Sequence, residues 1–231
     1  MNDQLILLLE TATTTCSVAL AENGNIIAVK EVNERNIHAS HITLFIDEVM
    51  SKSEKEYSDL RAIAISKGPG SYTGLRIGVS TAKGLCYALD IPLIGIDTIA
   101  AMASGLTEAF DIPDSGLLIP MVDARRMEVY TGIYRKDLSV VESVSAKIVD
   151  IDSFIEFREQ ELFLFGDGAD KFKVLFADQP NINFIDFSTS ASHLNFLTSK
   201  KFRDSEFENL AYFEPFYLKD FLFTTSKKGT L

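Results

Sequence analysis

The first third of the chain alternates between the two-residue period of strands and the period of about 3.6 residues that is typical of helices. Residues 5–12 form a short apolar run, and two further strand patterns flank the dipeptide Asn23-Gly24, which favours a tight hairpin turn. Residues 41–52 carry apolar side chains at positions i, i+3, i+4, i+7 and i+8, beginning at Ile42. We therefore expect a meander of strands followed by an amphipathic helix.

A glycine-rich segment joins the next predicted strand to the next predicted helix. Residues 60–66 have a strand pattern, and residues 66–85, SKGPGSYTGLRIGVSTAKGL, contain five glycines and one proline. The pattern over residues 72–89 predicts a helix, and a strand over 91–96 and a helix over 99–110 follow.

The second half of the chain repeats this order after the stretch DIPDSG at residues 111–116. Each half opens with three strand patterns, and the first of them ends on an acid, Glu10 or Asp123. Helix–strand–helix patterns follow at 152–158, 162–165 and 169–176. We predict an α/β fold with two lobes, each a mixed sheet flanked by helices, over residues 1–110 and 111–219, with a tail at 220–231.

The predicted helix at 72–89 is apolar or small on two sides. At about 100° per residue its core stripe consists of Leu75, Val79, Ala82, Leu85, Cys86 and Leu89. The opposite side holds Ile77, Thr81, Gly84 and Ala88, and a polar flank consists of Arg76, Ser80, Lys83 and Tyr87. Leu44 lies opposite the stripe of the preceding helix in the same way. A helix with two such sides is normally covered on both, either by the C-terminal part of the chain itself or by another protein.

Composition narrows the functional class. The net charge of −11 argues against a protein that holds nucleic acid by itself, because phosphate contacts require a basic face. Two cysteines are too few for a disulfide framework, which fits a reducing compartment. The apolar runs are too short to span a bilayer, and the first residues have no basic region typical of a secretory signal. We expect a cytoplasmic protein without membrane contact.

The candidate motifs for catalysis are weak. The glycine-rich segment has no Gly-Lys-Ser/Thr, and in a G-x-G-x-x-G reading from Gly68 the third glycine falls on Thr73. An anion site at the helix start and a purely structural turn remain alternatives. His38 and His41 have a spacing that suits a metal, but no third ligand lies nearby in the sequence.

Acids also end strands, in VDARRMEVY at 122–130 and in GDGAD at 166–170. They could hold Mg²⁺ or a hydroxyl group, or act as turn residues that bond to their own backbone.

Four stretches in order resemble the TsaB (YeaZ) family, bacterial subunits of the machinery that makes threonylcarbamoyladenosine in tRNA. They are LETATTTCSVAL, SKGPGSYTGLRIGVSTAKGL, VDARRMEVY and EPFYL. The resemblance implies the duplicated fold of actin, Hsp70 and sugar kinases (the ASKHA fold). It also implies a non-catalytic scaffold that binds and activates a TsaD-type subunit, which transfers threonylcarbamoyl to N6 of adenosine 37 in tRNA.

The same resemblance implies the partners and the cofactors. A TsaE-type ATPase would join the complex, tRNA would be held only through the complex, and the isolated chain would form a homodimer. No intrinsic cofactor or metal is implied, and ATP or ADP would bind only in the assembled complex. The metal-binding histidine pair of the TsaD-type subunit would fall on Asp97 and Ala101, and no histidine occurs between residues 42 and 192. No catalytic residue is therefore expected.

The resemblance assigns two groups of site residues. The partner interface would comprise His41, Leu44, Arg76, Ile77, Ser80, Thr81, Gly84 and Ala88. A vestigial nucleotide loop would comprise Glu10, Thr11, Thr13, Gly68, Gly70 and Ser71. Two alternative functions stay open, a glycoprotease-type peptidase and an ATP-dependent kinase of the same fold.

Overall fold

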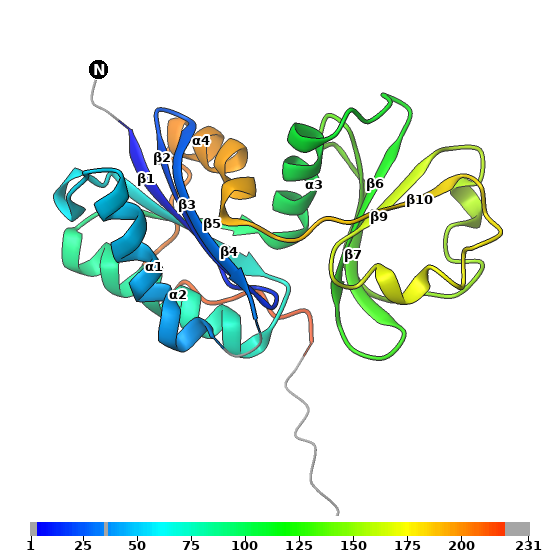
Figure 1. Ribbon diagram of the computed structural model, residues 1–231, viewed down its shortest axis with the longest axis horizontal. Coiled ribbons are helices and arrows are strands. Elements are labelled where there is room, and N and C mark those ends of the chain that lie inside the picture. Colours follow the sequence, from blue (N-terminus) through cyan, green and yellow to red (C-terminus); the bar gives the residue numbers. More distant parts are fainter. Residues whose placement is uncertain (1–3, 35–36, 220–231) are drawn as a thin grey trace, which may run out of the picture.

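The computed structural model describes residues 4–34 and 37–219 and shows two lobes side by side (Figure 1). The first lobe is built on a five-stranded sheet with the order β3-β2-β1-β4-β5. Its strands are β1 (Leu5–Glu10), β2 (Thr15–Glu22), β3 (Asn25–Asn33), β4 (Ala62–Gly68) and β5 (Leu93–Asp97). The three N-terminal strands form an antiparallel meander around the Asn23-Gly24 turn, whereas β1, β4 and β5 run parallel.

The second sheet repeats this topology. Its order, β10-β9-β6-β7-β8, is that of the first sheet written in reverse, with a β6–β7–β8 meander and with β9 and β10 added in parallel. Its strands are β6 (Leu117–Asp123), β7 (Glu128–Arg135), β8 (Val140–Ile148), β9 (Leu162–Phe165) and β10 (Ile182–Ile185). The predicted duplication of the fold is therefore confirmed.

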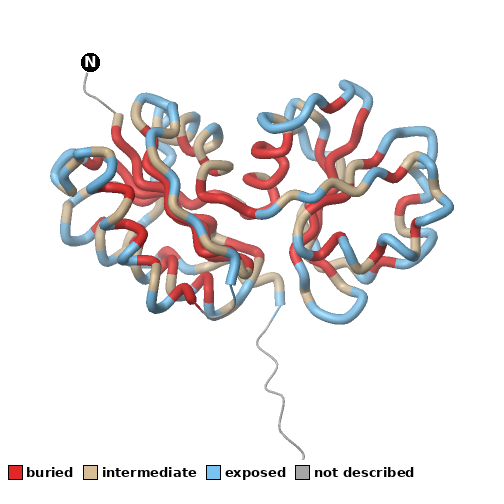
Figure 2. The backbone as a smooth tube through the Cα atoms, viewed as in Figure 1, coloured by how far each residue is buried: buried red, intermediate tan, exposed pale blue. Residues whose placement is uncertain are grey.

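Helices cover both faces of the first sheet. Alternate residues of β1 point to opposite faces, so that Leu5, Leu7 and Leu9 pack under α1 (His38–Lys52) and α2 (Tyr72–Leu89). Ile6 and Leu8 pack on the other face, against the segment η4 (Ala191–Leu194). Buried positions are concentrated in the two sheets and in α3 (Thr98–Ala109), which lies between them (Figure 2). The helix α3 packs on the second sheet through Met102 and Leu106 and on the first through Ala101.

The chain after β10 returns to the first lobe, although the sequence pattern places residues 111–219 together in the second. Thr189 and Thr13 share a hydrogen bond of 2.6 Å, and the Ala191 amide donates to the Ser17 hydroxyl at 2.9 Å. The helix α4 (Asn195–Arg203) follows η4 and packs beside β5. The returning segment helps to cover the second apolar face of the first sheet, and local periodicity does not reveal that this face needs such a cover.

Two further expectations, on the extent of helices, are corrected, and one on the tail stays untested. The predicted helices at 152–158 and 169–176 are reduced to single turns, η2 (Ile155–Phe157) and η3 (Asp170–Phe172), because loops rather than helices cover this face of the second sheet. The first helix begins at His38 rather than at residue 41. The expected tail at 220–231 lies outside the described residues. Within the described ranges, no helix is long and apolar enough to cross a membrane.

Candidate functional site

The outward surface of α1 and α2 combines exposed apolar and small side chains. We call the residues His41, Leu44, Ile77, Thr81, Gly84 and Ala88 the α1–α2 face. Leu44 is 57% exposed, and a Cβ added to Gly84 would meet no atom within 4 Å. The Thr81 hydroxyl donates to the Ile77 carbonyl at 2.9 Å, so this polar group is used within the helix. The face is therefore smooth and has few hydrogen-bonding groups to desolvate.

Ile77 and Tyr87 differ in exposure from what the sequence pattern of α2 indicates. Ile77 is only half exposed and packs against the core of the first lobe, so it supports the fold as well as the surface. Tyr87, which periodicity places on the polar flank of α2, is 83% exposed and adds a large aromatic group beside Gly84. An exposed aromatic side chain in a helix cannot be told from a buried one by its residue type.

The part of the polar flank of α2 that carries Arg76, Ser80 and Lys83 is covered by residues 208–217, which we call the C-terminal strap. Lys83 Nζ donates to the carbonyls of Ala211 at 3.3 Å and Phe213 at 2.9 Å. Arg76 Nε donates to the Tyr217 hydroxyl at 3.2 Å, and Arg76 together with Ser80 lines a groove of about 460 Å³ between α2 and the strap. The chain's own C-terminal part thus covers one flank of α2 and leaves the α1–α2 face open.

The six residues of the expected nucleotide loop do come together, where β1 ends and α2 begins. The Ser71 amide donates to the Ala12 carbonyl at 2.6 Å, and the Ser71 hydroxyl accepts from the Gly74 amide at 3.3 Å as the cap of α2. A Cβ at Gly70 would overlap the Ala12 carbonyl, and a Cβ at Gly68 would lie 2.6 Å from the Phe216 carbonyl. These glycines permit close approach of backbone to backbone, which favours the structural turn over an open phosphate cradle.

Glu10 is buried at the centre of this junction. Its Oε1 accepts hydrogen bonds from the Ala12 amide at 2.6 Å and the Ser66 hydroxyl at 2.9 Å. Burial raises the pKa of Glu10 to about 7, and the charge of Asp167 in the second lobe adds to the rise. Thr11 and Thr13 are also buried, and the Thr13 hydroxyl is hydrogen-bonded to the Thr189 hydroxyl.

His38, His41 and Asp97 make local contacts within the first lobe and at the start of α3. His38 is buried with Nε2 at 3.2 Å from the Thr15 carbonyl, and burial lowers its pKa, whereas the His41 ring packs edge-on against Phe45. Asp97 caps α3 by accepting from the Ala100 amide at 3.0 Å. Within residues 4–34 and 37–219, no group of three or more His, Cys, Asp or Glu side chains could hold a metal ion.

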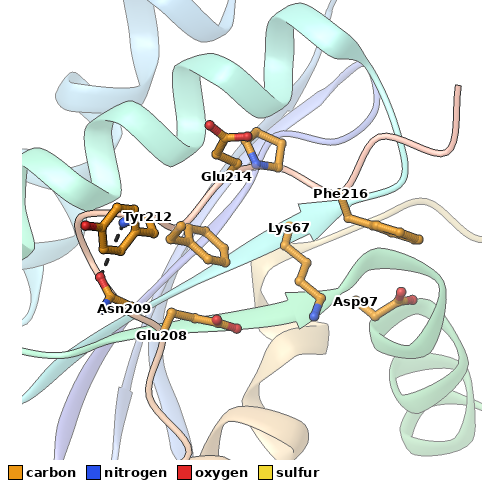
Figure 3. Close-up of a pocket in the computed structure, with 9 residues that line it drawn as sticks. Lys67, Asp97, Glu208, Asn209, Tyr212, Glu214 and Phe216 are labelled. Carbon is orange, nitrogen blue, oxygen red and sulfur yellow. Dashed lines mark hydrogen bonds between the residues drawn. The ribbon is translucent and has the colours of Figure 1, made fainter. Parts of the chain in front are cut away.

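A second groove, of about 540 Å³, opens at the carboxyl ends of β4 and β5, and the sequence pattern did not indicate it. Lys67 extends from β4 toward Asp97, while Glu208, Tyr212 and Phe216 of the strap form the facing wall (Figure 3). Burial raises the pKa of Asp97, and the Lys67 charge counteracts this rise. The strap thus completes this wall as well as the flank of α2.

The acids at the end of β6 serve the turn that follows. Asp123 Oδ1 accepts from the Arg125 amide at 3.0 Å and from Lys171 Nζ at 2.5 Å. Asp167 accepts from the Asp123 amide at 3.0 Å, and Asp170 pairs with Lys173 at 2.7 Å. Of the two alternatives, this arrangement fits turn residues better than a magnesium site.

Comparison with known proteins identifies the family. The family model described as "TsaD: tRNA N6-adenosine threonylcarbamoyltransferase" matches residues 29–228. The tRNA threonylcarbamoyladenosine biosynthesis protein TsaB of Escherichia coli is 36% identical over 57% of this chain and 55% of its own length. TsaB of Buchnera aphidicola from Schizaphis graminum is 31% identical over 75% of this chain and 82% of its own length. For the Escherichia coli, Haemophilus influenzae and Bacillus subtilis relatives, the chain spans little more than half of the relative's length.

Solved structures share the fold over almost the whole chain. YeaZ from Pseudomonas aeruginosa superposes with a TM-score of 0.79 at 22% identity, covering 93% of this chain and 100% of that one. The activator of the 2-hydroxyisocaproyl-CoA dehydratase from Clostridium difficile, solved with bound ADPNP, gives a TM-score of 0.52 at 10% identity, covering 89% and 99%. The chain belongs to the TsaB (YeaZ) family of tRNA threonylcarbamoyladenosine biosynthesis proteins, and its two lobes have the ASKHA fold.

Proposed function

We propose that this chain is a non-catalytic subunit that binds and activates a TsaD-type transferase in the synthesis of threonylcarbamoyladenosine in tRNA. The observation that carries the proposal is the open α1–α2 face. Two helices can pack at short interaxial distance where the contact side chains are small, and Gly84 and Ala88 supply such positions in the middle of the surface. Leu44 and Tyr87 supply exposed apolar area on the same two helices.

The proposal extends to the assembly. In the absence of the transferase, the same face would pair with a second copy of this chain, which gives a homodimer that exchanges for the heteromeric pair. A TsaE-type ATPase would join the pair, and ATP or ADP would bind only in the assembled complex. The tight packing of Gly68 and Gly70 against neighbouring carbonyls supports this scaffold role over an ATP-dependent kinase.

Gly84→Arg tests the interface without disturbing the fold. The side chain of Gly84 would point into open space, and arginine favours a helix more than glycine does. Ile77→Arg is a poorer test because Ile77 also packs on the core. At a helix–helix contact the new guanidinium would be buried without a partner, so we expect affinity for the transferase to fall about 100-fold or more.

The measurement is a pull-down and gel filtration with a TsaD-type transferase, followed by tRNA modification in the reconstituted mixture. Val174→Arg is the matched control, because Val174 is 91% exposed and lies in the second lobe, away from α1 and α2. We expect the control to bind and to activate as the wild type does. Wild-type affinity of Gly84→Arg would show that the interface lies elsewhere.

A further inference from the structure

The turn between β6 and β7 holds two successive arginines in a left-handed backbone conformation. Arg125 has φ +71° and Arg126 has φ +53°, a region that residues other than glycine, asparagine and aspartate rarely adopt. Both residues are exposed. Such a conformation persists only where the surrounding structure fixes it.

Three side chains brace this turn from outside. Lys171 Nζ, from the segment after β9, donates to Asp123 Oδ1 at 2.5 Å and to the Glu128 carbonyl at 2.7 Å. Asp167 accepts from the Asp123 amide, and Lys219, at the end of the described chain, pairs with the Glu128 carboxylate. In Figure 1 this last stretch of the chain reaches the space between the two lobes. The turn is therefore held rigidly from both the second lobe and the C-terminal segment.

The same contacts leave the two arginines as unpaired charges. The carboxylates of Asp123 and Glu128 are each matched by a lysine. Among the described residues, neither the Arg125 nor the Arg126 side chain has a hydrogen bond or an ion pair in the structure. A rigid tip thus presents two guanidinium groups to solvent on a chain whose net charge is −11.

We propose that Arg125 and Arg126 form a contact for the phosphate backbone of the RNA substrate, an inference that rests on the function proposed above. Guanidinium groups bind phosphate oxygens in a bidentate manner, and contacts of this kind position an RNA without reading its sequence. This chain would then supply one fixed contact while other subunits supply the rest of the affinity.

The surroundings favour a macromolecular phosphate over a free nucleotide. Neither of the two grooves described above is lined by Arg125 or Arg126, so their side chains border no such cavity. The exposed tip, in contrast, is accessible to a polyanion that approaches from solvent.

The double variant Arg125→Asn/Arg126→Asn tests the proposal. Asparagine tolerates the left-handed conformation, so the turn should keep its shape while both charges are lost. The probe is an unmodified tRNA transcript, titrated at several salt concentrations with this chain in complex with a TsaD-type transferase. We expect weaker binding and a slope of log Kobs against log[salt] that is shallower by about 1.4 to 1.8, the equivalent of two phosphate contacts.

Two control variants separate the effect of position from the effect of net charge. Arg125→Lys/Arg126→Lys keeps the charges and should restore the slope, with affinity regained only in part because lysine lacks the bidentate fork. Arg158→Asn/Lys200→Asn removes two exposed charges elsewhere and should leave the slope at its wild-type value if position matters. An equal loss in this control would show a net-charge effect and overturn the site.

Other outcomes separate this inference from the function on which it rests. If Arg125→Asn/Arg126→Asn binds tRNA as the wild type does, or loses only Mg-ATP binding measured by calorimetry, the RNA contact is refuted while the scaffold role stands. If the wild-type chain fails to pair with the transferase, the scaffold role is refuted. The same salt titration on the chain alone, at low salt, then still decides whether the two arginines bind RNA.

Discussion

At the scale of single residues, Glu10 is a carboxylic acid placed where water does not reach it. Its exposed fraction is 1%, and its hydrogen bonds from the Ala12 amide and Ser66 compensate burial only in part. Because burial penalises the carboxylate, the pKa rises from 4.5 to about 7. The folded protein therefore keeps a proton on Glu10 over a pH range in which the unfolded chain has lost it.

This difference makes the stability depend on pH in a defined direction. Between pH 4.5 and 7 the folded state binds more protons than the unfolded state, so the free energy of unfolding falls as pH rises, by about 3 kcal/mol in total. Glu10→Gln keeps an oxygen that accepts from Ala12 and Ser66 but does not titrate. We expect the variant to lose most of this fall, as measured by urea unfolding at several pH values from 5 to 8.

The control for this prediction is Glu156→Gln, because Glu156 is exposed in the second lobe. Its unfolding curves should follow the wild-type pH dependence. Parallel pH profiles for the wild type and Glu10→Gln would show that Glu10 carries its charge in the folded protein, contrary to the burial argument.

At the scale of elements, α2 shows that glycines in one helix can have opposite roles. A Cβ at Gly78 would overlap the Thr11 hydroxyl and lie 2.9 Å from Ile65, so this glycine lets the helix sit close to β1 and β4. Gly84, two turns later, meets nothing and only weakens the helix. The first glycine is thus required by packing, whereas the second keeps the outer surface flat.

Alanine substitutions at these two positions should therefore have opposite effects. Gly84→Ala should raise the free energy of unfolding by about 1 kcal/mol through helix propensity alone. Gly78→Ala should lower it by about 2 kcal/mol, because overpacking against Thr11 and Ile65 outweighs the propensity gain. Chemical denaturation of both variants compares them in one helix. Stabilisation by both substitutions would refute the close approach at Gly78.

The sequence predicts α2 and its two faces because a periodic helix fixes which residues point together. It equally predicts the repeated meanders, since each strand carries its own alternation and each turn its own signal. It does not predict β10 or α4, which are short and weakly patterned, or the strap, whose residues 208–217 are held by contacts to Lys83 and Arg76. For the same reason the sequence does not predict the left-handed turn at Arg125 and Arg126, because side chains distant in sequence hold this turn.

At the scale of the whole molecule, the two lobes share parts. The helix α3 gives Ala101 to the core of the first sheet and Met102 to that of the second. The segment after β10 crosses back, buries Leu194 on the first sheet, and continues into the strap. Unfolding of either lobe would therefore expose an apolar face of the other to water. We expect a single cooperative unfolding transition.

A pair of core substitutions, one in each lobe, tests this coupling. Leu194→Ala removes a fully buried side chain from the first lobe and should cost about 3 kcal/mol, and Phe172→Ala should cost about 4 kcal/mol in the second. If the lobes unfold together, each variant lowers hydrogen-exchange protection of β1 and of β6 by similar amounts, because both strands open only in the shared transition. If the lobes are independent, Leu194→Ala lowers protection of β1 alone and Phe172→Ala that of β6 alone. That separation would mean that α3 and the returning segment bind the lobes too weakly to couple their unfolding.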